Sequence, residues 1–210
     1  MKPVINVIRL GQVNIFKQLN IEELLLRKTD RNFAIINSGH PEKTIVVGFS
    51  GKIAELLDVE QVKAHRIKVI RRYTGGGTVI VDDNSVFASF ILNSADAKTA
   101  PFPREIMQWS VEEIYGPLFK NCGLSNKFSL RENDYTFDDK KIAGNAQTIT
   151  KNRWVHHTSF LWKFDPQNMK YLQVILLPYF ITFILLFYVV LLSYRRRDRH
   201  IGLIEIIRNF

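Results

Sequence analysis

The chain has 210 residues, enough for one ordinary domain with a sizeable core. Hydrophobic residues make up 46% of the sequence and charged residues 23%, a globular composition that argues against intrinsic disorder. The formal net charge is +9, from 29 basic and 20 acidic side chains, and outside the C-terminal tail the two signs are mixed. Outside that tail, the sequence therefore lacks the basic patch interleaved with aromatic residues that nucleic-acid binding requires.

The chain contains one cysteine, Cys122. A single cysteine excludes a disulfide framework and a cysteine-rich zinc site, and it fits a protein of a reducing compartment. Residues 1–20 lack the long apolar stretch and small-residue cleavage site of a secretory signal. They carry no acidic residue before Glu22, so a weak organelle presequence is an alternative to the strand and helix that we favour there. We therefore expect a cytoplasmic or mitochondrial protein.

The predicted elements mix strands and helices along the chain. Helical periodicity appears at 15–27, 53–65 and 104–120. Short apolar and β-branched runs predict strands at 4–9, 33–37, 44–48, 67–71, 78–81 and 86–92. Gly39, His40 and Pro41 separate two of these runs and indicate a hairpin. Further short runs between residues 135 and 162 are typical of antiparallel hairpins. Because strands and helices do not alternate strictly, we predict an α+β fold with a mixed, largely antiparallel β-sheet and flanking helices.

Residues 174–192 form a run of nineteen residues without a charge. At about 1.5 Å per residue, a helix of this length approaches the ~30 Å hydrocarbon thickness of a bilayer. Four arginines follow directly in the basic tail, residues 193–210. The run is therefore a candidate for a single membrane-spanning helix.

Three consecutive glycines lie between two apolar runs, within the segment 71–79. Glycines cost backbone entropy, and they are useful where the backbone approaches a ligand and exposes amides to an anion. Arg71 and Arg72 precede the glycines and add positive charge suited to a carboxylate or phosphate. A glycine-rich turn by itself is as often only a turn.

A lysine next to small residues marks the segment 133–147. Asp138 and Asp139 indicate a hairpin turn. Lys141 follows and begins a run rich in small side chains that leave room beside it. A lysine beside a cavity can place its ammonium on an oxygen where negative charge develops. The alternative is a solvated lysine at the end of a strand.

Two adjacent histidines, His156 and His157, lie in the last predicted strand. Adjacent strand residues point to opposite faces of a sheet, and no third ligand is spaced to join them. We therefore do not expect the pair to hold a metal ion.

Taken together, these segments resemble the biotin/lipoate A/B ligase family. RRYTGGGTVIVDD (71–83), NDYTFDDKKIAGNAQ (133–147) and HHTSFLW (156–162) occur in the order and spacing of lipoate–protein ligases. The resemblance extends to about residue 165. It implies a fold related to class II aminoacyl-tRNA synthetases, and an enzyme that activates lipoate or octanoate with ATP as an acyl-adenylate. The acyl group then passes to a lysine on a lipoyl domain.

The resemblance also implies roles for individual residues. Lys141 would be the catalytic residue, holding the acyl carbonyl and the phosphate. The residues implied for binding the acyl or adenylate group are Arg71, Arg72, Thr74, Gly75, Gly76, Gly77, Thr78, Val79, Asn133, Asp134, Gly144, Ala146 and His156. Asp134 would also be near magnesium. The implied cofactors are ATP and Mg²⁺, the substrate lipoate or lipoyl-AMP, and the partners lipoyl domains of 2-oxoacid dehydrogenases or the glycine-cleavage H protein.

The sequence departs from the family in three respects. Val81 stands before Asp82 where these ligases usually carry histidine. Nothing corresponds to the additional C-terminal domain of the larger bacterial-type ligases. Finally, family-like sequence at 170–173 and 194–200 is separated by the apolar run, which is either a membrane span or a retained intron. We expect a catalytic domain at 1–168, followed by the apolar segment 174–192 and the tail 193–210.

Two other functions stay open. An octanoyltransferase of the same superfamily takes its acyl group from acyl carrier protein through a cysteine thioester, which needs an activated thiolate. Cys122 is the one cysteine available, but its place at the end of an apolar helix favours a core residue. The other possibility is a non-catalytic protein that binds the acyl group or the adenylate without turnover.

Overall fold

The computed structural model describes residues 4–124, 127–161, 163 and 165–173. Two β-sheets carry the architecture, one of seven strands in the order β1-β2-β6-β10-β9-β8-β7 and one of three in the order β4-β3-β5. The strands are β1 (Ile5–Gly11), β2 (Asn32–Ser38), β3 (Thr44–Val47), β4 (Lys68–Arg71), β5 (Val79–Val81), β6 (Ser85–Asn93), β7 (Phe128–Arg131), β8 (Asp134–Phe137), β9 (Lys140–Ile149) and β10 (Arg153–Leu161). The helices are α1 (Ile15–Lys28), α2 (Ile53–Leu56), α3 (Val59–Ala64), α4 (Ser94–Ala97), α5 (Pro103–Trp109), η1 (Ser110–Tyr115), α6 (Gly116–Asn121) and η2 (Pro166–Tyr171).

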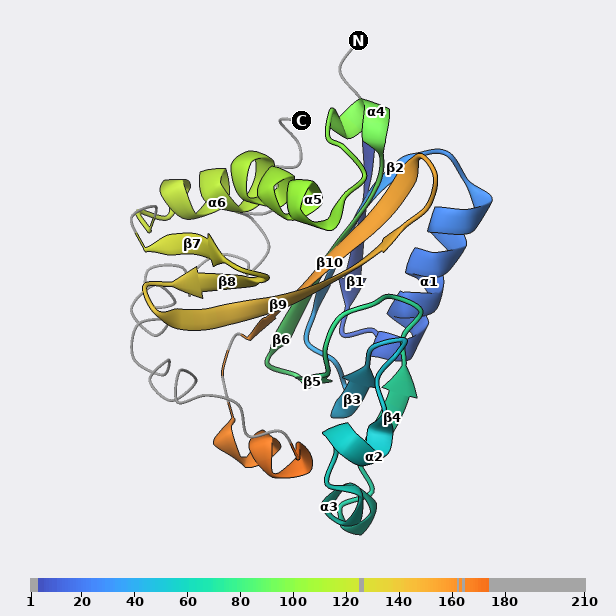
Figure 1. Cartoon of the computed structure of the whole chain (residues 1–210), viewed down its shortest axis with the longest axis vertical. Helices are drawn as coiled ribbons and strands as arrows, with labels where there is room; N and C mark the ends of the chain where they lie inside the picture. The colour runs from blue at the N-terminus through green and yellow to red at the C-terminus, as the bar shows by residue number, and fades with distance from the viewer. Residues whose placement is uncertain (1–3, 125–126, 162, 164, 174–210) are drawn as a thin grey trace.

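The large sheet is antiparallel except for one pair. β1 runs parallel to β2, whereas β2–β6, β6–β10, β10–β9, β9–β8 and β8–β7 are antiparallel. In the small sheet β3 pairs parallel with β4 and antiparallel with β5. Figure 1 shows α1 on one side of the large sheet and the α5–η1–α6 helix on the other. The predicted α+β class and largely antiparallel sheet are confirmed.

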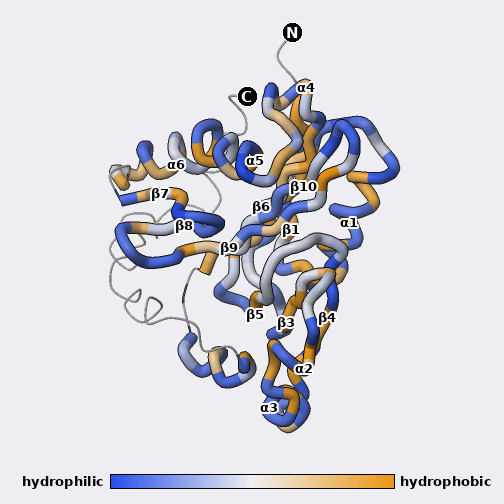
Figure 2. The backbone as a smooth tube through the Cα atoms, in the orientation of Figure 1, coloured by the Kyte–Doolittle hydropathy of each residue, from blue (hydrophilic) through white to orange (hydrophobic). Residues whose placement is uncertain are grey.

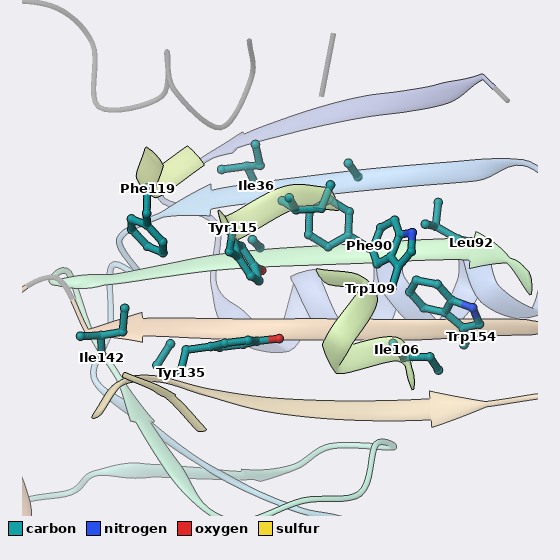
Figure 3. Packing of buried hydrophobic residues seen from close by; sticks show 14 of the residues in the cluster. Ile36, Phe90, Leu92, Ile106, Trp109, Tyr115, Phe119, Tyr135, Ile142 and Trp154 are labelled. Atoms are coloured by element: carbon teal, nitrogen blue, oxygen red, sulfur yellow. The ribbon is translucent and has the colours of Figure 1, made fainter. Parts of the chain in front are cut away.

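An aromatic core fills the space between the large sheet and the α5–η1–α6 helix. Trp109 and Tyr115 extend from the helix toward Phe90 and Trp154 of the sheet (Figure 3). The Trp109 and Trp154 rings meet edge to face, with centroids 5.2 Å apart, an arrangement that adds to the stability gained from burial. This core explains why the predicted helix 104–120 packs here.

That helix is not uniformly α-helical. A π-helical segment, η1, interrupts it, and the Gly116 N–H donates to the carbonyl of Val111. A Cβ on Gly116 would lie 2.5 Å from that carbonyl oxygen, so glycine permits the wider turn. The shift to i→i+5 hydrogen bonds in η1 could not be read from an apolar pattern with a period near 3.6 residues.

The hairpin predicted between 33–37 and 44–48 is wrong. Both runs are strands, but β2 and β3 belong to different sheets because β1 and β6 already occupy both edges of β2. Gly39, with φ of +77°, turns the chain away. The N–H groups of Gly39 and His40 donate to the carbonyls of Ser85 and Asp82, each at 2.9 Å.

The predicted helix 53–65 is divided into α2 and α3. Leu57 is extended and fully buried between them, and the Asp58 side chain caps α3 by accepting from the Gln61 N–H at 2.9 Å. η2 packs beside α3, and the Asp58 N–H donates to the Tyr171 carbonyl. The small sheet, α2 and α3 thereby form a second apolar cluster, and Figure 2 shows β3 mostly in hydrophobic colours.

None of the described helices is long and apolar enough to cross a membrane. The apolar run 174–192 and the tail 193–210 lie outside the described residues. The choice between a membrane span and a retained intron, and the domain boundary at residue 168, therefore stay predictions.

Candidate functional site

A cleft with a volume of about 400 Å³ opens between the glycine-rich segment, β9 and the beginning of β8. Most of the predicted site residues line it together: Arg72, Gly75, Gly76, Gly77, Thr78, Val79, Asn133, Asp134, Lys141, Gly144 and Ala146. Arg71, Thr74 and His156 do not line it. Segments separated by about seventy residues in the sequence thus share one cavity.

The glycine loop, residues 75–77, covers an edge of β9 that β8 leaves unpaired. β8 pairs with β9 only as far as Gly144, and beyond that point the Gly75 N–H donates to the Gln147 carbonyl at 3.2 Å. Gly76 has φ of +98°, and a Cβ there would lie 2.9 Å from the Arg72 guanidinium. The loop is therefore glycine-rich because its backbone packs tightly against β9 and Arg72.

Arg72 holds the glycine loop in place. Its side chain is buried, and one guanidinium nitrogen donates to the carbonyls of Gly75 at 3.0 Å and Gly77 at 2.7 Å. Burial lowers the pKa of Arg72 to about 10, opposed by the nearby Glu22 carboxylate. The group stays charged at neutral pH, so positive charge lies in the cleft wall while its donors order the loop.

Arg71 and Thr74 support the loop from outside the cleft. The Arg71 guanidinium donates to the carbonyls of Gly48, Phe49 and Gly51. The Thr74 carbonyl accepts from the Phe49 N–H at 3.0 Å. A Cβ on Gly48 would lie 2.0 Å from the carbonyl oxygen of Gly76, so the 48–51 turn packs directly under the glycine loop.

A β-bulge aims Lys141 at the cleft. Tyr135 pairs with Ala143 and Thr136 with Lys141, so Ile142 has no partner in β8. Ile142 and Ala143 both pack into the aromatic core. The extra residue therefore puts Lys141 on the same face as Gly144, whereas regular alternation would turn it toward the core. The predicted β8–β9 hairpin is confirmed, with Asp138 and Asp139 as its turn.

The Lys141 ammonium pairs with a carboxylate from the neighbouring strand. Its Nζ lies 2.7 Å from Asp134 Oδ1, and the two side chains are 31% and 40% exposed. The cleft thus contains a cation held beside β8, within reach of solvent. The Asn145 side-chain amide donates to the carbonyl of Asn133, which joins β9 to the turn before β8.

His156 does not line the cleft itself but contacts Gln147, which does. It belongs to a buried chain of hydrogen bonds. Its Nδ1 lies 3.0 Å from Gln147 Nε2, and its Nε2 lies 2.9 Å from the Tyr135 hydroxyl. That hydroxyl lies 2.5 Å from Ser110 Oγ, which donates to the Met107 carbonyl. Burial, with a smaller contribution from His157, lowers the pKa of His156 to about 3. The neutral imidazole therefore accepts from Gln147 and donates to Tyr135.

His157, which was not predicted as a site residue, lines the cleft instead. Its Nδ1 lies 3.0 Å from Glu22 Oε2, and both side chains are buried. The other Glu22 oxygen accepts from Ser89 Oγ at 2.6 Å and from Gln18 Nε2 at 3.1 Å. The two histidines thus face opposite sides of the sheet, as expected, and a carboxylate with hydrogen bonds at both oxygens orients the one at the cleft.

Other cleft residues were also missed: Phe87, Pro103, Met107, Asn145, Gln147 and Ser159. Strand alternation could have found Ser159, because it lies two residues after His157 and so faces the same side. No local pattern marks Pro103 and Met107, which reach the cleft through the packing of α5.

The described residues contain no group of three or more His, Cys, Asp and Glu side chains placed to hold a metal ion. Among the cleft-lining residues, Asp134 is the one carboxylate. Mg²⁺ is often held by one or two carboxylates together with substrate phosphates. A single carboxylate such as Asp134 fits a magnesium ion of that kind, and it does not make a site from protein ligands alone.

Comparison with known proteins identifies the class of this fold and cleft. A model of the lipoyl protein ligase A/B catalytic domain matches residues 14–175. The chain belongs to that family, as its motifs indicated.

Individual relatives agree with this assignment. The chain is 30% identical over 217 residues to inactive lipoate–protein ligase 2 of Plasmodium falciparum, covering 79% of this chain and 56% of the relative. It is 28% identical over 161 residues to the lipoate–protein ligase of Streptococcus pyogenes, covering 76% and 44%. The chain thus spans about half the length of the curated relatives it matches.

Solved structures confirm the fold. Lipoate–protein ligase A bound with ATP superposes with a TM-score of 0.71 at 19% identity, covering 100% of this chain and 82% of that one. A lipoate protein ligase from Thermoplasma acidophilum with bound lipoic acid gives 0.66 at 20% identity, covering 82% and 73%. Biotin protein ligase from Leishmania major gives 0.51 at 10% identity, covering 97% and 71%. At these identities the likeness establishes the lipoate and biotin ligase fold and no more.

Proposed function

We propose that this protein transfers a lipoyl or octanoyl group from its acyl-adenylate to a lysine of a lipoyl domain. The observation that supports this most directly is the single cleft lined by the glycine loop, with its buried arginine, and by Lys141. An acyl-adenylate has an anionic phosphate next to a polarised carbonyl. Two positive charges beside a loop without side chains suit that junction, because they can neutralise both the phosphate and the carbonyl oxygen.

In the proposed reaction, the amine nitrogen of the acceptor lysine forms a bond to the acyl carbon. The bond from that carbon to the adenylate oxygen breaks, AMP leaves with the electron pair, and the amine proton passes to solvent. Lys141 neutralises the charge that develops on the carbonyl and phosphate oxygens, while Arg72 keeps the loop ordered around the phosphate. The apolar lining from Phe87 and Met107 takes the acyl chain.

ATP, when bound, supplies the adenylyl group that activates the carboxylate. We propose that Asn133 and Asp134 lie on the nucleotide side. Asp134 would help to hold a magnesium ion there, and the ion would supply further positive charge for the phosphates. The ATP complex of a structural neighbour supports the nucleotide. The partner assignment is supported by an archaeal lipoylation system from T. acidophilum, a bi-partite lipoate protein ligase with its E2 lipoyl domain. Among lipoyl domains, those of 2-oxoacid dehydrogenases and the glycine-cleavage H protein are the proposed acceptors, in the cytoplasm or mitochondrion.

A specific observation favours a second function, binding without turnover. Val81, where these ligases usually carry histidine, is fully buried in an apolar cluster with Phe87 and Val46. This position therefore carries an apolar side chain, packed with the cleft-lining Phe87, and no imidazole. The Plasmodium relative at 30% identity is also named as inactive. This alternative retains the glycine loop and Lys141.

The two functions are separated by incubating the protein with an apo lipoyl domain and either lipoate, ATP and Mg²⁺ or preformed lipoyl-adenylate. Octanoate and octanoyl-adenylate are tested in parallel. A mass increase on the acceptor lysine, read by mass spectrometry, is expected. Modification only with the adenylates would place the activating step elsewhere. Retention of ligand with an unmodified acceptor in every mixture would overturn the enzyme and support the binder.

A further inference from the structure

Gly144 lies at the meeting point of the polar groups in the cleft. In the sheet it pairs with Asp134 of β8 and with Ser159 of β10. Because of the bulge at Ile142, the Lys141 side chain extends over the same face of β9. Gly144 has no side chain, so it leaves a notch at the point where these groups converge.

The size of this notch follows from the position a Cβ would take on Gly144. That point is 4.0 Å from Lys141 Nζ and 3.8 Å from Ser159 Oγ, with Lys141 Cε also at 3.8 Å. An oxygen atom placed there needs a shift of about 1 Å to reach hydrogen-bond distance from both donors. The flexible lysine and a rotating hydroxyl can supply that shift.

Ser159 is suited to donate into the notch. Its side chain is buried, with the residue only 5% exposed, and it lines the cleft. Its hydroxyl reaches the Gly144 carbonyl at 3.3 Å, long for an O–H donor, whose usual distance is about 2.7–2.8 Å. The Ser159 hydroxyl therefore loses little free energy when it exchanges this weak hydrogen bond for one to a ligand oxygen.

We propose that the notch over Gly144 receives the acyl carbonyl oxygen, and that the Ser159 hydroxyl is a second donor to it beside the Lys141 ammonium. This inference rests on the proposed function and adds a catalytic residue to it. As the acceptor amine attacks, the carbonyl oxygen gains negative charge, and two donors at one point stabilise it more than the ground-state carbonyl. Gly144 is required because any side chain there would occupy the oxygen's place.

The test measures acyl transfer from preformed lipoyl-adenylate to an apo lipoyl domain by wild type, Ser159→Ala, Gly144→Ala and Gly11→Ala. Gly144→Ala fills the notch without disturbing the fold, because its Cβ makes contacts of 3.8–4.0 Å, which are ordinary van der Waals distances. Gly11→Ala is the matched control, since a Cβ on Gly11 at the end of β1 meets nothing within 4 Å.

We expect Ser159→Ala to lower kcat about 10- to 100-fold with KM changed less than about threefold. Gly144→Ala should lower transfer at least as much, while its melting temperature and that of Gly11→Ala stay near wild type. Transfer by Ser159→Ala within twofold of an active wild type would overturn the second donor, whatever Gly144→Ala does. Absence of transfer by wild type would instead count against the proposed function.

Discussion

The two faces of β9 and β10 differ in what they bury. On the face toward α5–η1–α6, the two strands contribute Trp154 and Ala143 to an aromatic core, and the neighbouring β8 adds Tyr135 to it. On the opposite face, His157 and Ser159 lie beside small residues of β9 at the cleft. The first face buries apolar area and stabilises the fold. The second buries polar groups that give little net stability, which indicates that they are present for binding and chemistry.

The largest effect should come from the cleft face. Lys141→Ala removes the only cation of β9 that lines the described cleft, and we expect transfer to fall about 100- to 1,000-fold. Because the side chain is partly exposed and its ion pair with Asp134 lies at the surface, the free energy of unfolding should change by less than about 1 kcal/mol. Transfer rates and urea unfolding check both parts. Activity within about tenfold of wild type, roughly 1.4 kcal/mol, would show that the lysine is not central.

Arg72→Lys should have the next largest effect. Lysine keeps the charge but cannot donate from one planar group to the carbonyls of Gly75 and Gly77. We expect a roughly tenfold rise in KM for the acyl substrate and a smaller change in kcat. Steady-state kinetics measure this, with Arg71→Lys as the matched variant outside the cleft. An unchanged KM would mean that loop order does not contribute to binding.

Tyr135→Phe tests the aromatic face. It removes the hydroxyl between His156 and Ser110 and leaves the buried imidazole N–H without that acceptor. We expect a loss of about 1–3 kcal/mol in the free energy of unfolding, with transfer within about threefold of wild type. Denaturant unfolding measures the loss of stability, and the transfer assay measures the activity. A large activity loss at unchanged stability would contradict the division between the faces.

The buried His156 also predicts a dependence of stability on pH. Its pKa is about 3 in the folded protein and about 6.5 when unfolded. Between these values the unfolded chain binds more protons, so stability falls as the pH is lowered, by up to about 1.4 kcal/mol per pH unit. His40, whose pKa burial also lowers, contributes in the same direction. Urea unfolding from pH 7 to 4 should show a shallower slope in His156→Gln. Equal slopes would refute the neutral buried imidazole.

The smallest effect is expected from Cys122→Ser. Cys122 caps α6 and does not line the cleft, so it is poorly placed to carry an acyl thioester. Transfer should stay within about twofold of wild type. Loss of transfer together with loss of a hydroxylamine-sensitive acyl adduct on the protein would favour the octanoyltransferase route.

The sequence correctly predicted the features of the fold that depend on neighbouring residues alone. The turn Asp138–Asp139 and the strands around it came directly from residue pattern, as did the clustering of the glycine loop and Lys141 through family motifs. The sheet that receives β3 could not be read locally, because it depends on which edges of β2 are already occupied.

The missed site features have long-range causes. His157 meets Glu22 across 135 residues of sequence, and Pro103 reaches the cleft only after α5 has packed. The bulge at Ile142 is also invisible to a two-residue period, yet it decides which face Lys141 joins. Buried apolar positions can be predicted from the regular alternation of side chains along strands and helices. The position of Lys141 in the cleft depends on a bulge that interrupts this alternation.

The proposed function requires the glycine loop and Lys141 to bind one and the same ligand. An NMR titration of the ¹⁵N-labelled protein with a non-hydrolysable lipoyl-adenylate analogue tests it most directly. We expect the amide signals of Gly75–Gly77 and of Lys141 and Gly144 to shift together, with a single dissociation constant. Shifts confined to one of the two segments, or to neither, would contradict it.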